Sequence, residues 1–343
     1  MRPILVLGYF GYNTNQLDGQ TVKTRDVYKL LSELYRGVEH YDTEEFKFRK
    51  LSILKMFWKI INSSTICYLP AHNNLKYIFP VIFCLSFVFR IRIHYFVVGG
   101  WLADFIKDLP VHRFMLSHIQ GIHVETNKLK DDLETLYGFN NVDLFPNFRY
   151  FKFDENNSIR ESRDIESIKL VFVSRVDQTK GLDTLLKVSE ILVERELASR
   201  VSIDFYGQKK DDFFDNNLST ISMYKYKGEL QPEQVIETIS KYDALIFPTH
   251  YEGEGCPGIL IEALAAGLPI IASNWKYNGE FIVNDVNGFL CEVLNAEQYV
   301  DAIQRLLYDK ELLRQMSASS YMKSRDFSAA NAKLMIENIV NNI

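Results

Sequence analysis

The stretch that decides the fold spans residues 247–273 and reads Phe-Pro-Thr-His-Tyr-Glu-Gly-Glu-Gly-Cys-Pro-Gly-Ile-Leu-Ile-Glu-Ala-Leu-Ala-Ala-Gly-Leu-Pro-Ile-Ile-Ala-Ser. Its pattern predicts the end of a strand, a glycine-rich loop, a helix that begins around Pro257 or Gly258, and another strand. Glycines at 253, 255 and 258 let the backbone approach a ligand, and the helix start offers N–H groups and a positive dipole end to an anion. The stretch is therefore typical of a phosphate-binding loop in an α/β fold.

On both sides of this stretch, short apolar runs alternate with helical patterns, which is typical of parallel sheets covered by helices. The expected strands are Ile4–Leu7, Val38–Tyr41, Thr65–Leu69, Ile91–Val98, Ile122–Glu125, Val142–Phe145, Lys169–Ser174, Val201–Tyr206, Met223–Lys227, Ala244–Phe247 and Leu268–Ala272. The expected helices lie near 21–35, 44–62, 73–89, 126–137, 181–197, 232–241, 257–266 and 296–315. We therefore predict an α/β protein with two facing Rossmann-like, doubly wound domains and a ligand cleft at the carboxyl ends of their strands.

A polar segment at 154–166, rich in Glu, Asn, Ser and Arg, interrupts this alternation. The length of 343 residues suits two domains, since a domain averages roughly 150 residues. We place the N-terminal domain at 1–150, a linker at 151–168 and the C-terminal domain at 169–325. Residues 326–343 are expected to form a helix that packs back on the N-terminal domain.

The composition excludes several classes of protein. The chain has 39 Lys and Arg against 44 Asp and Glu and is 47% hydrophobic, which excludes a disordered tail, a small binding module and a fibrous protein. Four cysteines stand far apart without a CxxC pair, so neither a disulfide framework nor a zinc site is indicated, and a reducing cytoplasm fits best. The apolar run at the N-terminus is too short for the core of a signal peptide and is expected to be a strand.

Two glutamates flank the predicted phosphate-binding helix start. Glu254 precedes the helix and Glu262 lies one turn inside it, so both carboxylates can face one cleft. Glu262 stands beside apolar Ala263 and Leu264, and a carboxylate buried there needs a partner. The alternative is that the loop only turns and that each glutamate caps a helix or pairs at the surface.

Two basic residues follow the first strand of the same domain, in Phe172-Val-Ser-Arg-Val-Asp-Gln-Thr-Lys-Gly-Leu. Arg175 follows the buried strand and Lys180 precedes a helix. They place two positive charges at the mouth of the cleft, which suits a diphosphate. The ordinary alternative is a solvated lysine at a helix start.

With these motifs the chain resembles the retaining, metal-independent glycosyltransferases of family four, which have the two-domain GT-B fold. Their E-x7-E motif is matched by Glu254 and Glu262. The resemblance implies that Glu254 contacts the donor sugar, that Glu262 binds the ribose, and that Arg175 and Lys180 hold the pyrophosphate and stabilise it as it leaves. Glu252 is a rival for the first role, although its spacing is poorer. The resemblance further implies donor contacts from the loop and helix start, at Gly255, Cys256, Gly258 and Ile259.

The N-terminal half carries weaker signals. The loop after the first strand resembles the family's glycine loop, with Gly19 and Gln20 opening the next helix toward the donor. Gly99, Gly100 and Trp101 stand where many relatives carry a histidine, and they are expected to contact acceptor or sugar or to form a simple turn. His94, His118 and His123 are typical of strand or helix residues rather than of catalysts.

From Phe46 to Ala103 the chain has no acidic residue. Eight basic residues lie in this stretch, namely Lys47, Arg49, Lys50, Lys55, Lys59, Lys76, Arg90 and Arg92. They accompany an amphipathic pattern at 47–61 and an apolar run at 78–89, which is too short to span a bilayer. The stretch favours an anionic membrane surface, and the alternative is a buried helix with a basic solvated edge.

We predict a retaining glycosyltransferase that moves a sugar from a nucleotide-diphosphate donor, UDP-sugar rather than GDP-sugar, to a carbohydrate acceptor. No resident cofactor and no metal are expected. The acceptor is expected to be a lipid-linked glycan of surface polysaccharide synthesis, and the protein to be cytoplasmic and peripheral on the inner face of the cell membrane. Nucleic acid is not expected as a partner. The alternatives are a nucleotide-sugar epimerase or hydrolase of the same fold and a non-catalytic nucleotide-sugar-binding protein.

Overall fold

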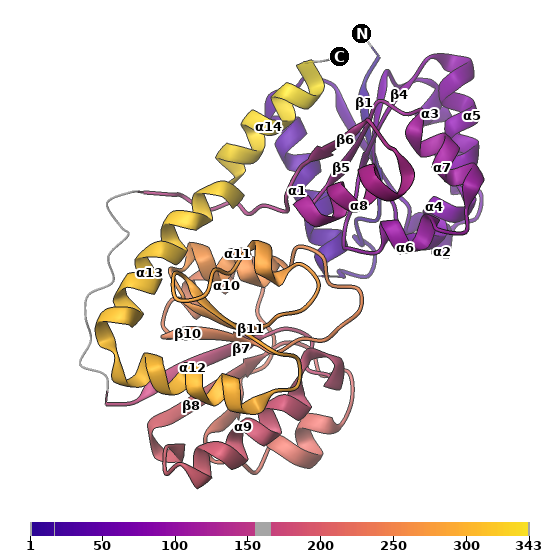
Figure 1. Ribbon diagram of the computed structural model, residues 1–343. Coiled ribbons are helices and arrows are strands. Elements are labelled where there is room, and N and C mark those ends of the chain that lie inside the picture. The colour runs from indigo at the N-terminus through magenta and orange to yellow at the C-terminus, as the bar shows by residue number, and fades with distance from the viewer. Residues whose placement is uncertain (1, 17, 155–165, 342–343) are drawn as a thin grey trace. The chain divides into compact units, whose positions relative to one another are not determined.

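A computed structural model of the chain describes residues 2–16, 18–154 and 166–341 (Figure 1). The chain forms two compact domains. The N-terminal domain comprises Met1–Phe148 with Gly253–Cys256 and Ala329–Ile343, and the C-terminal domain comprises Arg149–Glu252 and Pro257–Ser328. Of the expected linker, residues 155–165 lie outside the described residues.

The N-terminal domain is built on a six-stranded parallel sheet with the order β2-β1-β3-β4-β5-β6. Its strands are β1 (Ile4–Gly8), β2 (Val38–Asp42), β3 (Thr65–Leu69), β4 (Arg92–Phe96), β5 (Gly121–Val124) and β6 (Val142–Leu144). The central strands are buried along almost their whole length. Helices cover both faces of such a sheet, which explains why these strands read as short apolar runs.

The helices of this domain begin with α1, whose start has a clear local cause. Asp18 caps it, because the Thr21 N–H donates to Asp18 Oδ1 at 2.9 Å and Thr21 Oγ1 accepts from the Asp18 N–H at 3.0 Å. The helices are α1 (Gly19–Leu34), α2 (Glu45–Phe48), α3 (Ser52–Ile61), α4 (His72–Tyr77), α5 (Phe79–Phe89), α6 (Leu102–Ile106), α7 (Pro110–Ser117), α8 (Asn127–Tyr137) and α14 (Ala329–Asn341). Helices α1 and α14 lie together on one side of the sheet, and α3, α5 and α7 lie on the other (Figure 1).

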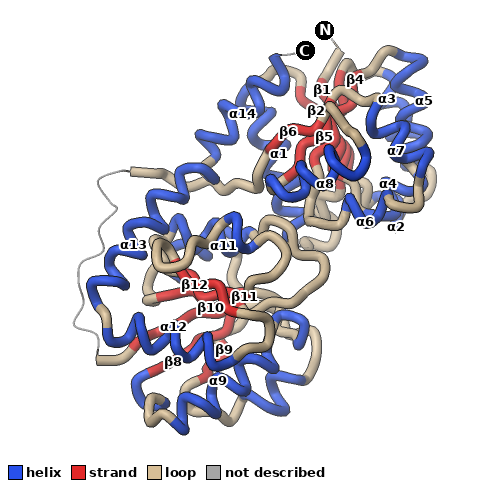
Figure 2. Tube along the Cα trace, viewed as in Figure 1, coloured by secondary structure: helices blue, strands red, loops and turns tan. Residues whose placement is uncertain are grey.

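The C-terminal domain contains a second six-stranded parallel sheet, in the order β12-β11-β10-β7-β8-β9. Its strands are β7 (Ile168–Val173), β8 (Val201–Tyr206), β9 (Tyr224–Tyr226), β10 (Ala244–Phe247), β11 (Ile270–Ser273) and β12 (Gly288–Cys291). Its α-helices are α9 (Leu182–Glu194), α10 (Val235–Ile239), α11 (Gly258–Ala265), α12 (Ala296–Tyr308) and α13 (Lys310–Ser324). Helices α9 and α12 cover one face of the sheet, and α11 covers the other (Figure 2). Helix α10 packs against α11, and α13 packs against both α11 and α12.

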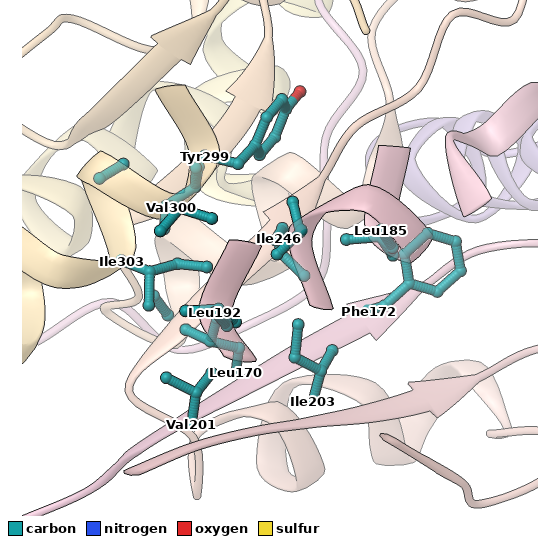
Figure 3. Packing of buried hydrophobic residues seen from close by; sticks show 14 of the residues in the cluster. Leu170, Phe172, Leu185, Leu192, Val201, Ile203, Ile246, Tyr299, Val300 and Ile303 are labelled. Carbon is teal, nitrogen blue, oxygen red and sulfur yellow. The ribbon is translucent and has the colours of Figure 1, made fainter. Parts of the chain in front are cut away.

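The core of this domain packs strand side chains against α9 and α12. Leu170 and Ile203 lie beside Leu192 of α9 and Ile303 of α12, and all four are completely buried (Figure 3). Strand β8 alternates buried and half-buried residues, so one of its faces meets these helices. Helices on both faces of two parallel sheets confirm the predicted fold class of two Rossmann-like α/β domains.

Three long predicted helices are each divided in the structure. The predicted helix at 73–89 breaks before Phe79, because Pro80 fits only the first turn of a new helix. The predicted helix at 296–315 ends at Tyr308, where Asp309 caps α13 by accepting from the Leu312 N–H at 2.9 Å. The predicted helix at 44–62 divides into α2 and α3. Helices α6 and α7 and strand β12 were not predicted, since each is too short to show a clear period.

The end of the chain belongs to the N-terminal domain, in which α14 packs against α1. Among the described residues, no helix is both long enough and apolar enough to cross a membrane.

A buried ion pair ties α1 to the carboxyl ends of β4 and β5. Lys23 Nζ lies 2.7 Å from Glu125 Oε1, and both side chains are almost completely buried. Lys23 Nζ also donates to the Val97 carbonyl at 3.1 Å, and Glu125 Oε2 accepts from the Gly99 N–H at 2.9 Å. Since each charge is paired and hydrogen-bonded, burial is tolerated. Removing one partner would leave an uncompensated charge in the core.

We expect Lys23→Met to lower the free energy of unfolding of the N-terminal domain by about 3–5 kcal/mol, the usual cost of leaving one buried charge unpaired. Urea denaturation monitored by circular dichroism measures this loss. The control is Lys29→Met, which changes an exposed lysine of the same helix and should cost little. Adding Glu125→Gln to Lys23→Met should restore part of the lost stability. A single variant as stable as the wild type would contradict the expectation.

Candidate active site

The strand order of the C-terminal sheet determines where its ligand site can lie. Strands β7 and β10 are neighbours, yet the helices that follow them, α9 and α11, cover opposite faces of the sheet. Such a switch point leaves an opening at the carboxyl ends of the two strands, where open α/β sheets bind ligands. The loop after β7 carries Arg175 and Lys180, and α11, which follows the loop after β10, begins with Gly258 and Ile259.

Arg175 and Lys180 lie around one aromatic ring at this opening. The Arg175 guanidinium carbon lies 4.8 Å and the Lys180 ammonium 4.5 Å from the centre of the Tyr251 ring. Lys180 is buried, and the side chain of Arg175 is 43% exposed. Tyr251 therefore holds two positive charges near each other by cation–π contacts, and Asp177 Oδ2 lies 3.8 Å from Arg175 Nε. Two cations beside one carboxylate favour an anionic ligand at this place.

The backbone fixes the two loops against each other. The His250 N–H donates to the Thr179 carbonyl at 3.0 Å. Gly181 has a φ of +87°, and a Cβ there would overlap the Pro248 carbonyl. Only glycine combines this conformation with this close approach, so Gly181 keeps Lys180 at the edge of the loop after β10.

The second predicted glutamate has a partner that the sequence did not reveal. Arg149 Nε donates to Glu262 Oε1 at 2.6 Å, and each side chain is only 12% exposed. A Cβ at Gly258 would overlap the Arg149 guanidinium. Glycine at 258 thus makes room for the protein's own arginine, whereas the sequence suggested only the approach of a ligand. Pro257, the residue before α11, has no side-chain acceptor with which to cap the helix.

The first predicted glutamate lies in the short segment Gly253–Cys256, which belongs to the N-terminal domain. Glu254 is buried there. The Cys256 N–H donates to Glu125 Oε2 at 3.3 Å, and the Cys256 carbonyl accepts from Asn147 Nδ2 at 3.2 Å. The carboxylate paired with Lys23 therefore also holds the segment that carries Glu254.

The loop after β4 packs closely on this segment. Gly99 has a φ of +85°, and a Cβ at Gly255 would overlap the Gly99 backbone. Trp101 Nε1 donates to the Val98 carbonyl at 2.7 Å, and its ring stacks on His72. The structure thus brings Gly99, Gly100 and Trp101 beside the segment that carries Glu254.

Other predicted positions lie apart from these contacts. Glu252, the rival of Glu254, is exposed and pairs with Lys276 at 2.9 Å. Gln20 Nε2 donates to the Leu69 carbonyl at 3.1 Å, and a Cβ at Gly19 would have no neighbour within 4 Å among the described atoms. The start of α1 therefore has open space around it.

The histidines of the N-terminal strands lie inside the sheet. His94 Nδ1 lies 3.0 Å from His123 Nε2 and the rings stack. Burial lowers the pKa of His94 to about 4 and that of His123 well below its usual value. Both are neutral near pH 7, and His118 is exposed and bonded to its own helix.

Sequence reasoning missed Arg149, Tyr251, Lys23 and Glu125. Arg149 and Glu262 are 113 residues apart, and Lys23 and Glu125 are 102 apart. No local spacing links such pairs. Tyr251 was within reach, because an aromatic residue in the loop after β10 lies opposite the loop that carries the two cations.

Part of the chain is similar in sequence to known glycosyltransferases. Residues 154–323 match the family described as "Glycosyl transferases group 1". A glycosyltransferase of unspecified activity from Haemophilus influenzae is 29% identical over 48% of this chain and 46% of its own length. A poly(ribitol-phosphate) alpha-N-acetylglucosaminyltransferase from Staphylococcus aureus is 24% identical over 59% of this chain and 40% of its own length. The chain thus spans about half the length of these curated relatives or less.

Two solved structures resemble the whole chain. HepE of Anabaena in complex with UDP superposes with a TM-score of 0.76 at 15% identity, covering 99% of this chain and 100% of the other. Sucrose-phosphate synthase from Thermosynechococcus elongatus has a TM-score of 0.76 at 14% identity, with 100% and 99% coverage. These likenesses show the fold. Over residues 154–323 the chain is similar to glycosyl transferases group 1, and its two Rossmann-like domains have the GT-B fold.

Proposed function

We propose that the protein transfers a sugar from a nucleotide-diphosphate donor, preferably a UDP-sugar, to a carbohydrate acceptor with retention of configuration. The observation that carries the proposal is the pair of cations, Arg175 and Lys180, held on Tyr251 at the switch point of the C-terminal sheet. The similarity of residues 154–323 to glycosyl transferases supports it. Structures of HepE with UDP and with UDP-glucose support a nucleotide sugar as the donor.

In this proposal, electrostatics replaces a metal at the leaving group. Arg175, Lys180 and the N–H groups of Gly258 and Ile259 at the start of α11 neutralise the diphosphate as its bond to the sugar breaks. Glu262 binds the ribose, and Glu254 contacts the sugar that is transferred.

Backbone groups complete the proposed donor and acceptor sites. We assign Gly255 and Cys256, like Glu254, to donor binding, and we assign Gly19 and Gln20 to the donor as well. Gly99, Gly100 and Trp101 contact the acceptor or the sugar.

We expect Arg175→Ala and Lys180→Ala each to lower turnover by tens of fold or more, because losing one group that stabilises a developing anion costs about 10²–10³ in rate. UDP release from a panel of UDP-sugars, with a glycolipid extract as acceptor, measures turnover. Lys187→Ala, at an exposed lysine on α9, is the matched control.

Folded variants of Arg175 and Lys180 with wild-type turnover would contradict this role. The same assay is run in EDTA, where activity should persist. Abolition by EDTA and recovery with manganese would refute metal-independent transfer. Product analysis separates the alternatives, since an epimerase or hydrolase turns over without acceptor and a binding protein does not turn over.

The two glutamates should behave differently. Glu262→Ala should weaken both UDP and UDP-sugar, because the ribose is common to them, whereas Glu254→Ala should spare UDP and lower transfer. Isothermal titration with UDP, together with the turnover assay, measures this split. Glu252→Ala is the control, because Glu252 is exposed and paired with Lys276. Equal UDP affinity in wild type and all variants would remove the support for the Glu262 role.

We also infer that one face of the N-terminal domain docks on an anionic membrane surface. Helix α5 has eleven residues and no charge, yet only Phe79 and Ile82 are buried. It packs between α3 and α7 (Figure 1). Large exposed apolar side chains lie on these three helices and at the residue before α3, and we name this set the apolar face: Leu51, Leu54, Trp58, Phe87, Val88, Val111 and Phe114. Such a face marks an interaction site.

The charges around the apolar face differ from the sequence expectation. Lys55 pairs with Glu45 at 3.3 Å and Lys59 pairs with Glu39, two acids that lie just before the acid-free stretch. These two lysines therefore contribute less to membrane attraction than the sequence suggested. Exposed Arg49, Lys50 and Arg90 keep the face basic, and each charge contributes about 1 kcal/mol near an anionic surface.

Docking of this kind suits a lipid-linked glycan acceptor of surface polysaccharide synthesis, with the protein peripheral on the cytoplasmic side of the membrane. The similarity to a capsular polysaccharide biosynthesis glycosyltransferase from Staphylococcus aureus, 23% identical over 55% of this chain, supports this setting.

We expect Trp58→Ser, Phe87→Ser and Val88→Ser together to abolish co-sedimentation with phosphatidylglycerol vesicles, because insertion of the apolar face is lost. Arg49→Glu with Lys50→Glu should weaken binding mainly at low salt, since charge attraction decays over about 8 Å at physiological ionic strength. Leu136→Ser, at an exposed leucine of α8, is the matched control. UDP affinity should be unchanged throughout. A wild-type protein that leaves these vesicles unbound would refute the membrane proposal.

A further inference from the structure

We propose that Arg149 is a positioning residue that holds the Glu262 carboxylate for the ribose hydroxyls of the nucleotide. The inference rests on the proposed function, since it assumes a nucleotide at Glu262.

The backbone of Arg149 is anchored by the chain that follows α13. Its N–H donates to the Phe327 carbonyl at 3.0 Å, and its backbone bridges to Ser328 in parallel. The arginine therefore belongs to a small backbone ladder made with the chain that follows α13. The ladder fixes the position of the Arg149 Cα, and from there the side chain extends to α11.

The Arg149 guanidinium contacts two residues of α11, Gly258 and Glu262. It lies on Gly258, the first residue of the helix, where a Cβ would overlap it, and Nε donates to Glu262 Oε1 at 2.6 Å. Because both side chains are only 12% exposed, water competes little for this contact. The carboxylate is thereby held in one orientation.

The contact uses only part of the carboxylate. Arg149 is bonded to Oε1, and within residues 2–16, 18–154 and 166–341 no hydrogen bond is made to Glu262 Oε2. A carboxylate has about four acceptor sites, so Oε2 can accept from a hydroxyl while Oε1 stays with the arginine. A vicinal diol such as that of ribose presents the donors that this oxygen needs. A charge-assisted hydrogen bond of this kind strengthens binding by tenfold or more.

The test compares UDP with 2′,3′-dideoxyuridine diphosphate, which keeps the base and diphosphate but lacks both ribose hydroxyls. Isothermal titration of the wild type should show at least tenfold weaker binding of the dideoxy compound. In Arg149→Met this ratio should fall to about twofold, while affinity for the dideoxy compound changes little. Glu262→Gln should reduce the ratio similarly, and the double variant should be no worse, because both residues act through one carboxylate.

Two further variants keep the test decisive. Arg149→Lys retains a positive charge beside Glu262, so this variant should fold even if Arg149→Met does not. Because lysine lacks the Nε–H, the affinity ratio of UDP to the dideoxy compound should still be reduced. Arg305→Met breaks an exposed ion pair with Asp285 in the same domain and should leave the ratio unchanged. Melting temperatures verify that each variant is folded.

The outcomes separate the inference from the proposed function. A wild-type ratio in folded Arg149→Met and Arg149→Lys, with both ligands weakened alike, would assign Arg149 to the diphosphate or to the fold and overturn the inference alone. A wild type that binds both ligands equally would overturn the role of Glu262 as well. A wild type that binds neither UDP, ADP nor GDP would overturn the proposed function together with the inference.

Discussion

The reversal of strand order between β7 and β10 is the constraint on which the candidate site depends. Adjacent parallel strands whose following helices cover opposite faces leave an opening at their carboxyl ends, next to the two loops that lead into these helices. One loop brings the two cations and the other brings Tyr251 and the start of α11. The strand order therefore decides which loops meet at the candidate site, and the residues on those loops then decide its charge.

A second theme is that the protein fills with its own atoms several spaces that look prepared for a ligand. Gly258 gives room to the Arg149 guanidinium, and Gly255 gives room to the Gly99 backbone. The buried carboxylates follow the same rule, since Glu125 has Lys23 and Glu262 has Arg149. Compensated charges of this kind are rigid, because leaving either partner alone in the interior is costly.

Much of the fold was predictable from sequence, because buried parallel strands appear as apolar runs and helices show their own period. Local motifs also singled out Arg175 and Lys180, which the structure brings together on the Tyr251 ring. The partners of the buried charges were not predictable, since Arg149 is brought to Glu262 only by the tertiary fold. For the same reason the sequence overstated the free positive charge of Lys55 and Lys59. Their ion-pair partners, Glu45 and Glu39, lie just before the acid-free stretch.

The segment Gly253–Cys256 has a consequence for how the halves of this protein can be exchanged with those of relatives. The chain passes from one domain to the other at 148/149, 252/253, 256/257 and 328/329. A chimera joined at a single point near residue 150 would supply Glu125 and Asn147 with a foreign loop segment at Cys256 and would give α1 a foreign helix in place of α14. Exchange of these domains therefore needs matched junctions at all of these crossings.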